Sequence, residues 1–152
     1  MKRLKLLCAV VGWVACTMAG VAQEKGNWRA ASKTAASTTG DVAFANEKIS
    51  INFASFPIAQ IRALQQVEIG AMFDSDSTAG GSGNLYRLSI PAVKKFLHKN
   101  SLCGDEETQW MTTYVHGRTL ELAFFSGATM PAFTPDAIAN ATNLCGIYSY
   151  SR

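Results

Sequence analysis

Cysteine and histidine are scarce in this chain, and their scarcity limits the chemistry that it can carry out. Beyond residue 22 there are two cysteines, Cys103 and Cys145, and the two histidines are His98 and His116. No Cys-x-x-Cys or His-x-x-x-His spacing preorganises a zinc site. Neither histidine has a serine–aspartate arrangement near it in the sequence. An enzyme is therefore the least expected class, and no cofactor is predicted.

Runs of lysine and arginine are also absent. The net charge of +3 arises from 14 basic and 11 acidic residues, and three of the basic ones lie among the first five residues. Without those three, 11 basic and 11 acidic residues remain, so the net charge is zero. A nucleic-acid binder needs a basic face, and the one small cluster here is Lys94, Lys95 and Lys99. We therefore expect no nucleic-acid partner.

The chain has one long apolar run, at its N-terminus, and no second. Residues 1–22 combine three basic residues, an apolar stretch and small residues at Gly20 and Ala22, an order typical of a secretory signal cleaved after Ala22. A membrane anchor and lipidation of Cys16 are the alternatives, but the run is short for a span and Trp13 fits a lipidation signal poorly. Residues 23–152 are thus expected in the periplasm or outside the cell, with no stable membrane span.

Export would place the two remaining cysteines in an oxidising compartment, where a Cys103–Cys145 disulfide is the first expectation. Chain entropy gives such a bond about 4 kcal/mol of stabilisation. One alternative is zinc held by both cysteines with His98 and His116. Another is a nucleophilic cysteine with His116 as its base, which requires a free thiol.

Alternation of apolar and polar residues dominates the rest of the chain and predicts strands. The predicted strands cover residues 27–33, a hairpin over 42–53, 84–90, a hairpin over 110–125 and 146–152. Residues 57–63 fit a strand or a helix start, and we predict a strand followed by a short helix over 64–73. Short helices are also predicted over 91–100 and after Thr134. The expected fold is mainly β, a single domain over 23–152, with seven or eight antiparallel strands in a small barrel or sandwich and two or three short helices.

The hairpin over 110–125 presents two different faces. Pairing His116 with Thr119 gives one face that is apolar throughout and belongs in the core. The other face carries Trp110, Tyr114 and Phe125. Exposed aromatic side chains on a rigid sheet favour partner binding, so these three residues are the predicted binding face. The competing expectation is that a helix or the N-terminal segment covers them.

The polar stretch DSDSTAGGSGN contains the candidate metal ligands Asp74 and Asp76. Their spacing fits the start of a calcium loop, but an EF-hand would require glycine in place of Ala79 and glutamate in place of Leu85. A flexible polar loop is the competing interpretation.

The stretches GNWRAASKTA and TGDVAFANEKISINF, the two LCG triplets, LAFFSG and GIYSY resemble a group of small exported bacterial proteins. Gly26-x-Trp28 ahead of β-hairpins is similar to lipocalin-like barrels and to small envelope inhibitors of proteases and lysozyme. The first resemblance implies no mechanism. We predict a non-enzymatic exported module that binds a protein or envelope component, such as an envelope or host hydrolase. The alternative is a carrier of a small apolar ligand in a barrel interior.

Overall fold

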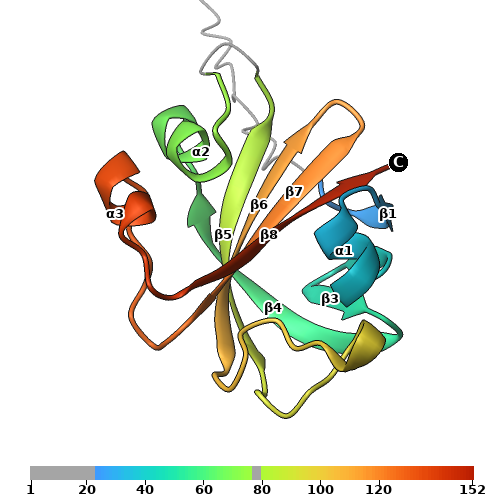
Figure 1. The fold of residues 1–152 in the computed structure, drawn as a ribbon. Coiled ribbons are helices and arrows are strands. Elements are labelled where there is room, and N and C mark those ends of the chain that lie inside the picture. The colour runs from blue at the N-terminus through green and yellow to red at the C-terminus, as the bar shows by residue number, and fades with distance from the viewer. Residues whose placement is uncertain (1–22, 77–79) are drawn as a thin grey trace, which may run out of the picture.

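The computed structural model describes residues 23–76 and 80–152, which form a closed barrel (Figure 1). Within these ranges there are eight strands: β1 Gly26–Ala30, β2 Val42–Ala45, β3 Lys48–Ile51, β4 Ala54–Ala63, β5 Ser82–Ile90, β6 Thr108–His116, β7 Thr119–Ser126 and β8 Leu144–Ser151. The same ranges contain the helices α1 Lys33–Thr38, α2 Gln66–Phe73 and α3 Pro135–Ala139 and the 3-10 turn η1 Leu97–Lys99. The predicted signal at 1–22 lies outside the described residues.

Each strand pairs antiparallel with the next in the chain, and β1 closes the barrel by pairing with β8. The prediction of a mainly β, antiparallel fold with eight strands is therefore confirmed in its barrel form. The predicted β6–β7 register is also confirmed, with His116 opposite Thr119 and Trp110 opposite Phe125. A turn that begins with glycine, here Gly117 at φ 56°, fixes that register locally.

Apolar side chains from all eight strands fill the barrel interior. Its buried centre includes Trp28, Ile49, Met111, Phe124 and Tyr150, each fully shielded from solvent. Helix α1 contributes Ala35 to the same cluster, and Ser32 caps this helix by accepting a hydrogen bond from the Ala35 N–H at 3.1 Å. Because side chains occupy the interior, the core stabilises the fold and leaves its binding surfaces to the rim and the outside.

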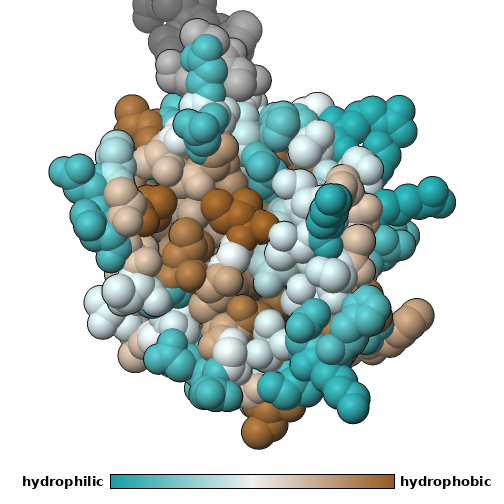
Figure 2. All heavy atoms as spheres, in the orientation of Figure 1, coloured by the Kyte–Doolittle hydropathy of each residue, from teal (hydrophilic) through white to brown (hydrophobic). Residues whose placement is uncertain are grey.

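A second apolar cluster lies outside the barrel, beneath α2 and α3. These two helices sit on the same side of the barrel in Figure 1, and Figure 2 shows apolar side chains gathered over that region. Ile69 and Met72 from α2 and Phe133 from the segment before α3 pack in this cluster. The outer faces of β6 and β7 are consequently buried as well as their inner faces. No helix within the described ranges is both long enough and apolar enough to span a membrane.

One predicted helix is absent from the structure, and one observed helix was not predicted. Residues 91–100 do not form a helix: they cross the barrel end as a turn in which His98 and Lys99 adopt positive φ of 54° and 61°. Burial of Phe96 and Leu102 in the core draws this segment across the barrel, and that gain outweighs its helix propensity. Helix α1 was not predicted, because its small polar residues resemble a linker.

Candidate functional site: a lateral pocket beside strand β4

The predicted aromatic binding face is not on the surface. Trp110, Tyr114 and Phe125 are buried, with 7%, 1% and 0% of their surface exposed. Helix α2 covers Tyr114 through Phe73, whose ring stacks at 5.7 Å between centroids, and Phe133 packs on Phe125 at 6.0 Å. The prediction that these three residues form an exposed face is therefore wrong, and the competing expectation of a covering helix is correct.

An ion pair holds the start of α2, and its removal tests how strongly this covering helix is attached to the barrel. Glu68 accepts two hydrogen bonds at 2.8 Å from Arg62 and the Gln65 N–H, and a second oxygen takes a further 2.8 Å bond from Arg62. The hydrogen bond from Arg62, followed by that from Gln65, lowers the pKa of Glu68. Its stabilisation is therefore present above the ordinary carboxyl pKa and is lost as pH falls through the lowered one.

We expect Glu68→Gln to lower the free energy of unfolding by about 1 kcal/mol at pH 7, because the partly exposed ion pair and the negative charge in the first turn of the helix are lost. Urea unfolding at pH 7 and again at pH 3 measures this difference, which should shrink at the lower pH. Equal stabilities at pH 7 would contradict the role given to Glu68. The Arg62→Gln variant removes the ion pair but leaves Glu68 in the first turn of the helix, so it separates the contribution of the ion pair from that of the negative charge there.

The other predicted sites do not assemble. Cys103 and Cys145 form the predicted disulfide, so neither thiol is available for zinc or nucleophilic catalysis. Across residues 23–76 and 80–152, no three histidine, cysteine, aspartate or glutamate side chains gather as a metal site, so no third side chain of these types joins the candidate calcium ligands Asp74 and Asp76 there. Asp74 instead ends α2 at a φ of 50°.

The barrel wall opens where β4 extends beyond its neighbour β3. The last pair between them is Lys48 with Pro57, and one more backbone bond joins the Ile58 N–H to the Glu47 carbonyl at 2.9 Å. From Ala59 to Ala63 the register of the described strands gives β4 a partner only in β5. β3 has four residues and β4 has ten, so this difference in length leaves one edge of β4 free.

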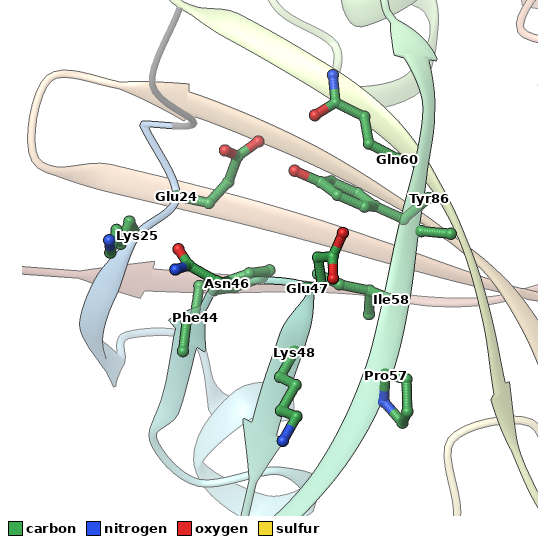
Figure 3. A pocket seen from close by; sticks show the side chains of 12 residues that line it. Glu24, Lys25, Phe44, Asn46, Glu47, Lys48, Pro57, Ile58, Gln60 and Tyr86 are labelled. Atoms are coloured by element: carbon green, nitrogen blue, oxygen red, sulfur yellow. The ribbon is translucent and has the colours of Figure 1, made fainter.

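A pocket of about 1040 Å³ lies beside that free edge (Figure 3). One wall is β4 from Pro57 to Gln60, and the opposite wall is Glu24, Lys25 and the turn between β2 and β3. Phe44, Ile58 and Tyr86 supply apolar surface. This volume is in the range of small-ligand and peptide side-chain sites.

Glu24 lies deep in this pocket and is 1% exposed. Its Oε1 accepts hydrogen bonds from Asn84 Nδ2 at 2.7 Å and Thr113 Oγ1 at 2.5 Å, and its backbone carbonyl accepts one from Trp28 Nε1 at 2.7 Å. Oε2 is buried and has no hydrogen-bond partner among the described residues. A buried acceptor without a partner is destabilising and uncommon, so Oε2 can accept a hydrogen bond that the described residues do not supply.

Tyr86 faces the same carboxyl group across the pocket (Figure 3). Burial, and after it the negative charge of Glu24, raises the pKa of Tyr86 far above the usual value for a phenol. The hydroxyl therefore keeps its proton at physiological pH and is available as a donor beside the carboxylate.

This site was not among those predicted from the sequence. Glu24 is the second residue after the predicted signal, where it resembles a solvated terminal residue, and Tyr86 fits an ordinary core position. The informative signal was the difference in length between the two short strands over 42–51 and the long alternating stretch that follows them.

Comparison with protein-family models, curated proteins and solved structures finds no match to this chain. The resemblance to lipocalin-like barrels and small envelope inhibitors thus stays a prediction, and the pocket is interpreted from its own geometry.

Proposed function

We propose that this protein is an exported, non-enzymatic binding module that takes an extended segment of another polypeptide at the free edge of β4. The observation that carries this proposal is the edge itself, where the five residues from Ala59 to Ala63 have no neighbouring strand on one side among residues 23–76 and 80–152. Peptides add to such edges through main-chain hydrogen bonds, and adjacent pockets select their side chains.

The pocket defines the side chain that the bound segment would carry. Oε2 of Glu24 offers a buried negative charge without a partner among the described residues, next to the apolar surfaces of Phe44 and Ile58. A lysine or arginine side chain matches this arrangement, because its aliphatic stem packs on apolar surface while its charged end pairs with the carboxylate. The rim of the pocket carries charges of both signs, from Lys25, Glu47 and Lys48, so it discriminates between side chains less strongly than Glu24 does.

Selection from a displayed library of random peptides on the exported protein tests the proposal. We expect enriched peptides with alternating apolar residues and one basic residue. Hydrogen exchange should slow at the amides of Ala59–Ala63 when such a peptide binds. An absence of enrichment, or protection confined to another part of the barrel, would contradict strand addition.

Two matched variants identify the role of the carboxylate. Glu24→Gln keeps an oxygen for Asn84 and Thr113 but removes the charge, and it should weaken the selected peptide at least tenfold, by about 1.4 kcal/mol or more. Glu47→Gln removes a rim charge from the same pocket and should change affinity by no more than about twofold. Equal losses in the two variants would remove Glu24 from the recognition site.

The alternative function is a carrier of a small amphipathic ligand in the same pocket. Oε2 of Glu24, which has no hydrogen-bond partner in the part of the chain that the structure describes, favours it, since a small amine would also fit. A small-molecule adduct in the native mass spectrum that Glu24→Gln abolishes would support the carrier in place of the peptide binder.

A further inference from the structure

The turn between β3 and β4 holds an aromatic residue in a backbone conformation that suits glycine. Ile51 pairs with Ala54, and the two residues between them, Asn52 and Phe53, have φ of 46° and 67°. Two positive φ values in a two-residue hairpin turn match type I′, which favours Asn-Gly. Phenylalanine at the second position is sterically strained, because its Cβ approaches the backbone carbonyl.

Burial does not compensate for this strain. The Phe53 side chain is fully exposed, at 103% of its reference surface. It thus lies outside the core, and exposing a large apolar side chain at a strained position is unfavourable in the isolated protein. The presence of phenylalanine at this strained and exposed position is explained if the turn presents Phe53 to a binding partner.

The neighbouring surface is basic and partly apolar. Phe53 shares an outer groove with Gly40, and Leu97 lies so close to Gly40 that a Cβ built there would be 3.1 Å from Leu97 Cδ1. The connection between β5 and β6 also packs Phe96 against Phe56 of β4, with 6.1 Å between the ring centroids, and it carries Val93, which is 84% exposed. Arg29 lines the same groove as Phe53, Lys94 Nζ lies 5.9 Å from the Phe96 ring, and Lys99 follows His98, whose Nδ1 is 3.0 Å from the Ser37 carbonyl oxygen at the end of α1.

These lysines are available to an external anion. The ion pairs found in the described parts of the chain are Arg62–Glu68 and His116–Glu121, neither of which involves them. Asp41 is the acidic residue of the groove, and its Oδ1 accepts a hydrogen bond from the Ala30 N–H at 2.9 Å. Arg29, Lys94 and Lys99 thus outnumber Asp41 around the groove. Asp105, Glu106 and Glu107 lie further along the same connection, where Glu106 accepts a hydrogen bond from Ser126 and Glu107 accepts one from Ser89.

We infer that this end of the barrel docks on an anionic lipid surface, with Phe53 and Val93 entering the interfacial region and the lysines facing lipid headgroups. Exposed apolar tips surrounded by lysines are the combination that holds peripheral proteins at such surfaces. This inference is independent of the β4 pocket and of what binds there.

Flotation with lipid vesicles tests it, using protein purified after export with its N-terminus defined by mass. The wild type should bind vesicles containing about 30% phosphatidylglycerol and lose most binding in about 0.5 M salt, where surface charges are screened. Pure phosphatidylcholine vesicles should bind at least about tenfold more weakly. Equal binding to both lipids, or no binding at low salt, would overturn the inference.

Phe53→Gly makes the test specific, because it should relieve the backbone and weaken docking together. We expect vesicle partitioning to fall about five- to tenfold while the unfolding equilibrium constant decreases by about threefold. Val67→Ser, which removes a 71% exposed valine from α2, is the matched control and should leave partitioning unchanged. Unchanged partitioning in Phe53→Gly, or an equal loss in Val67→Ser, would overturn the role of the turn.

Discussion

Gly83→Ala is expected to lower the free energy of unfolding by about 3 kcal/mol, roughly 10 °C in the melting temperature. Gly83 lies in β5 opposite Tyr114, and a Cβ there would collide with the carbonyl oxygen of Thr113. The same Cβ would lie 3.3 Å from Leu64 and 3.4 Å from Ile69, so the added methyl group cannot move away from the Thr113 carbonyl without meeting another residue. Strand glycines commonly mark such close backbone approaches. Thermal and urea unfolding measure the change.

Gly146→Ala is the matched control on β8. The Cβ added there would meet the Tyr148 ring at 3.2 Å, and this side chain can move whereas the Thr113 carbonyl cannot. We expect a change of no more than about 1 kcal/mol. Equal losses in the two variants would show that glycine is required in these strands for a reason other than the close approach to β6.

The hairpin register was predictable because both of its determinants are local. Alternation over 110–125 fixes which residues share a face, and Gly117 fixes the turn, so each residue's partner follows. The identity of the exposed face was not predictable. Alternation distinguishes two faces of a strand, but whether α2 and α3 cover the outer one depends on packing between segments far apart in the chain.

The lateral pocket could not be predicted from the sequence for a related reason. It results from barrel closure, which brings Glu24 at the start of the chain beside β4 and leaves β4 longer than β3. Glu24 is also held by Asn84 and Thr113, each about 60 or more residues away in sequence. The strained turn was more nearly predictable, because Asn52 is of a type common in turns. Phe53 stands where glycine would be expected, however, and phenylalanine is typical of a strand.

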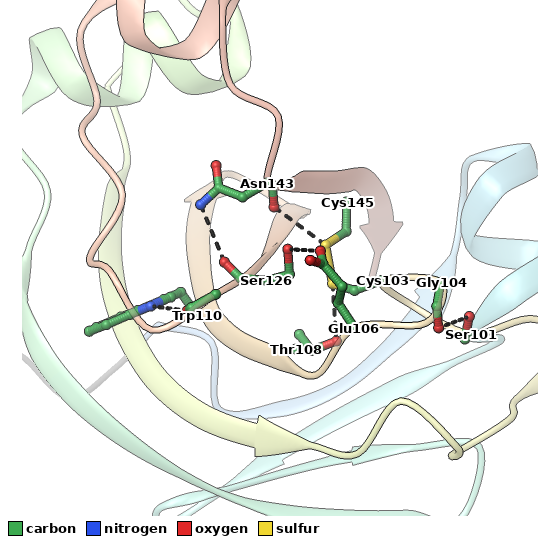
Figure 4. The surroundings of a disulfide bond; sticks show 10 residues. Ser101, Cys103, Gly104, Glu106, Thr108, Trp110, Ser126, Asn143 and Cys145 are labelled. Atoms are coloured by element: carbon green, nitrogen blue, oxygen red, sulfur yellow. Dashed lines mark hydrogen bonds between the residues drawn. A yellow bond between two sulfur atoms is a disulfide. The ribbon is translucent and has the colours of Figure 1, made fainter.

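Removing the disulfide with Cys103→Ala and Cys145→Ala together should lower the free energy of unfolding by about 4 kcal/mol, or roughly 10–15 °C. The bond joins the segment between β5 and β6 to the start of β8 across a separation of 42 residues (Figure 4). Denatured chains without it gain conformational entropy because this large loop is no longer closed. Denaturant unfolding of the double variant and of the parent measures the change.

Reduction of the parent protein separates the bond from the side-chain change. Both cysteines are packed against the barrel core, so alanine also removes two sulfur atoms from that contact. If cross-linking is the main effect, the reduced parent should unfold within about 1 kcal/mol of the double variant, and both should keep the barrel at low temperature. A reduced parent as stable as the oxidised one would mean that residual structure already holds these segments together in the denatured chain.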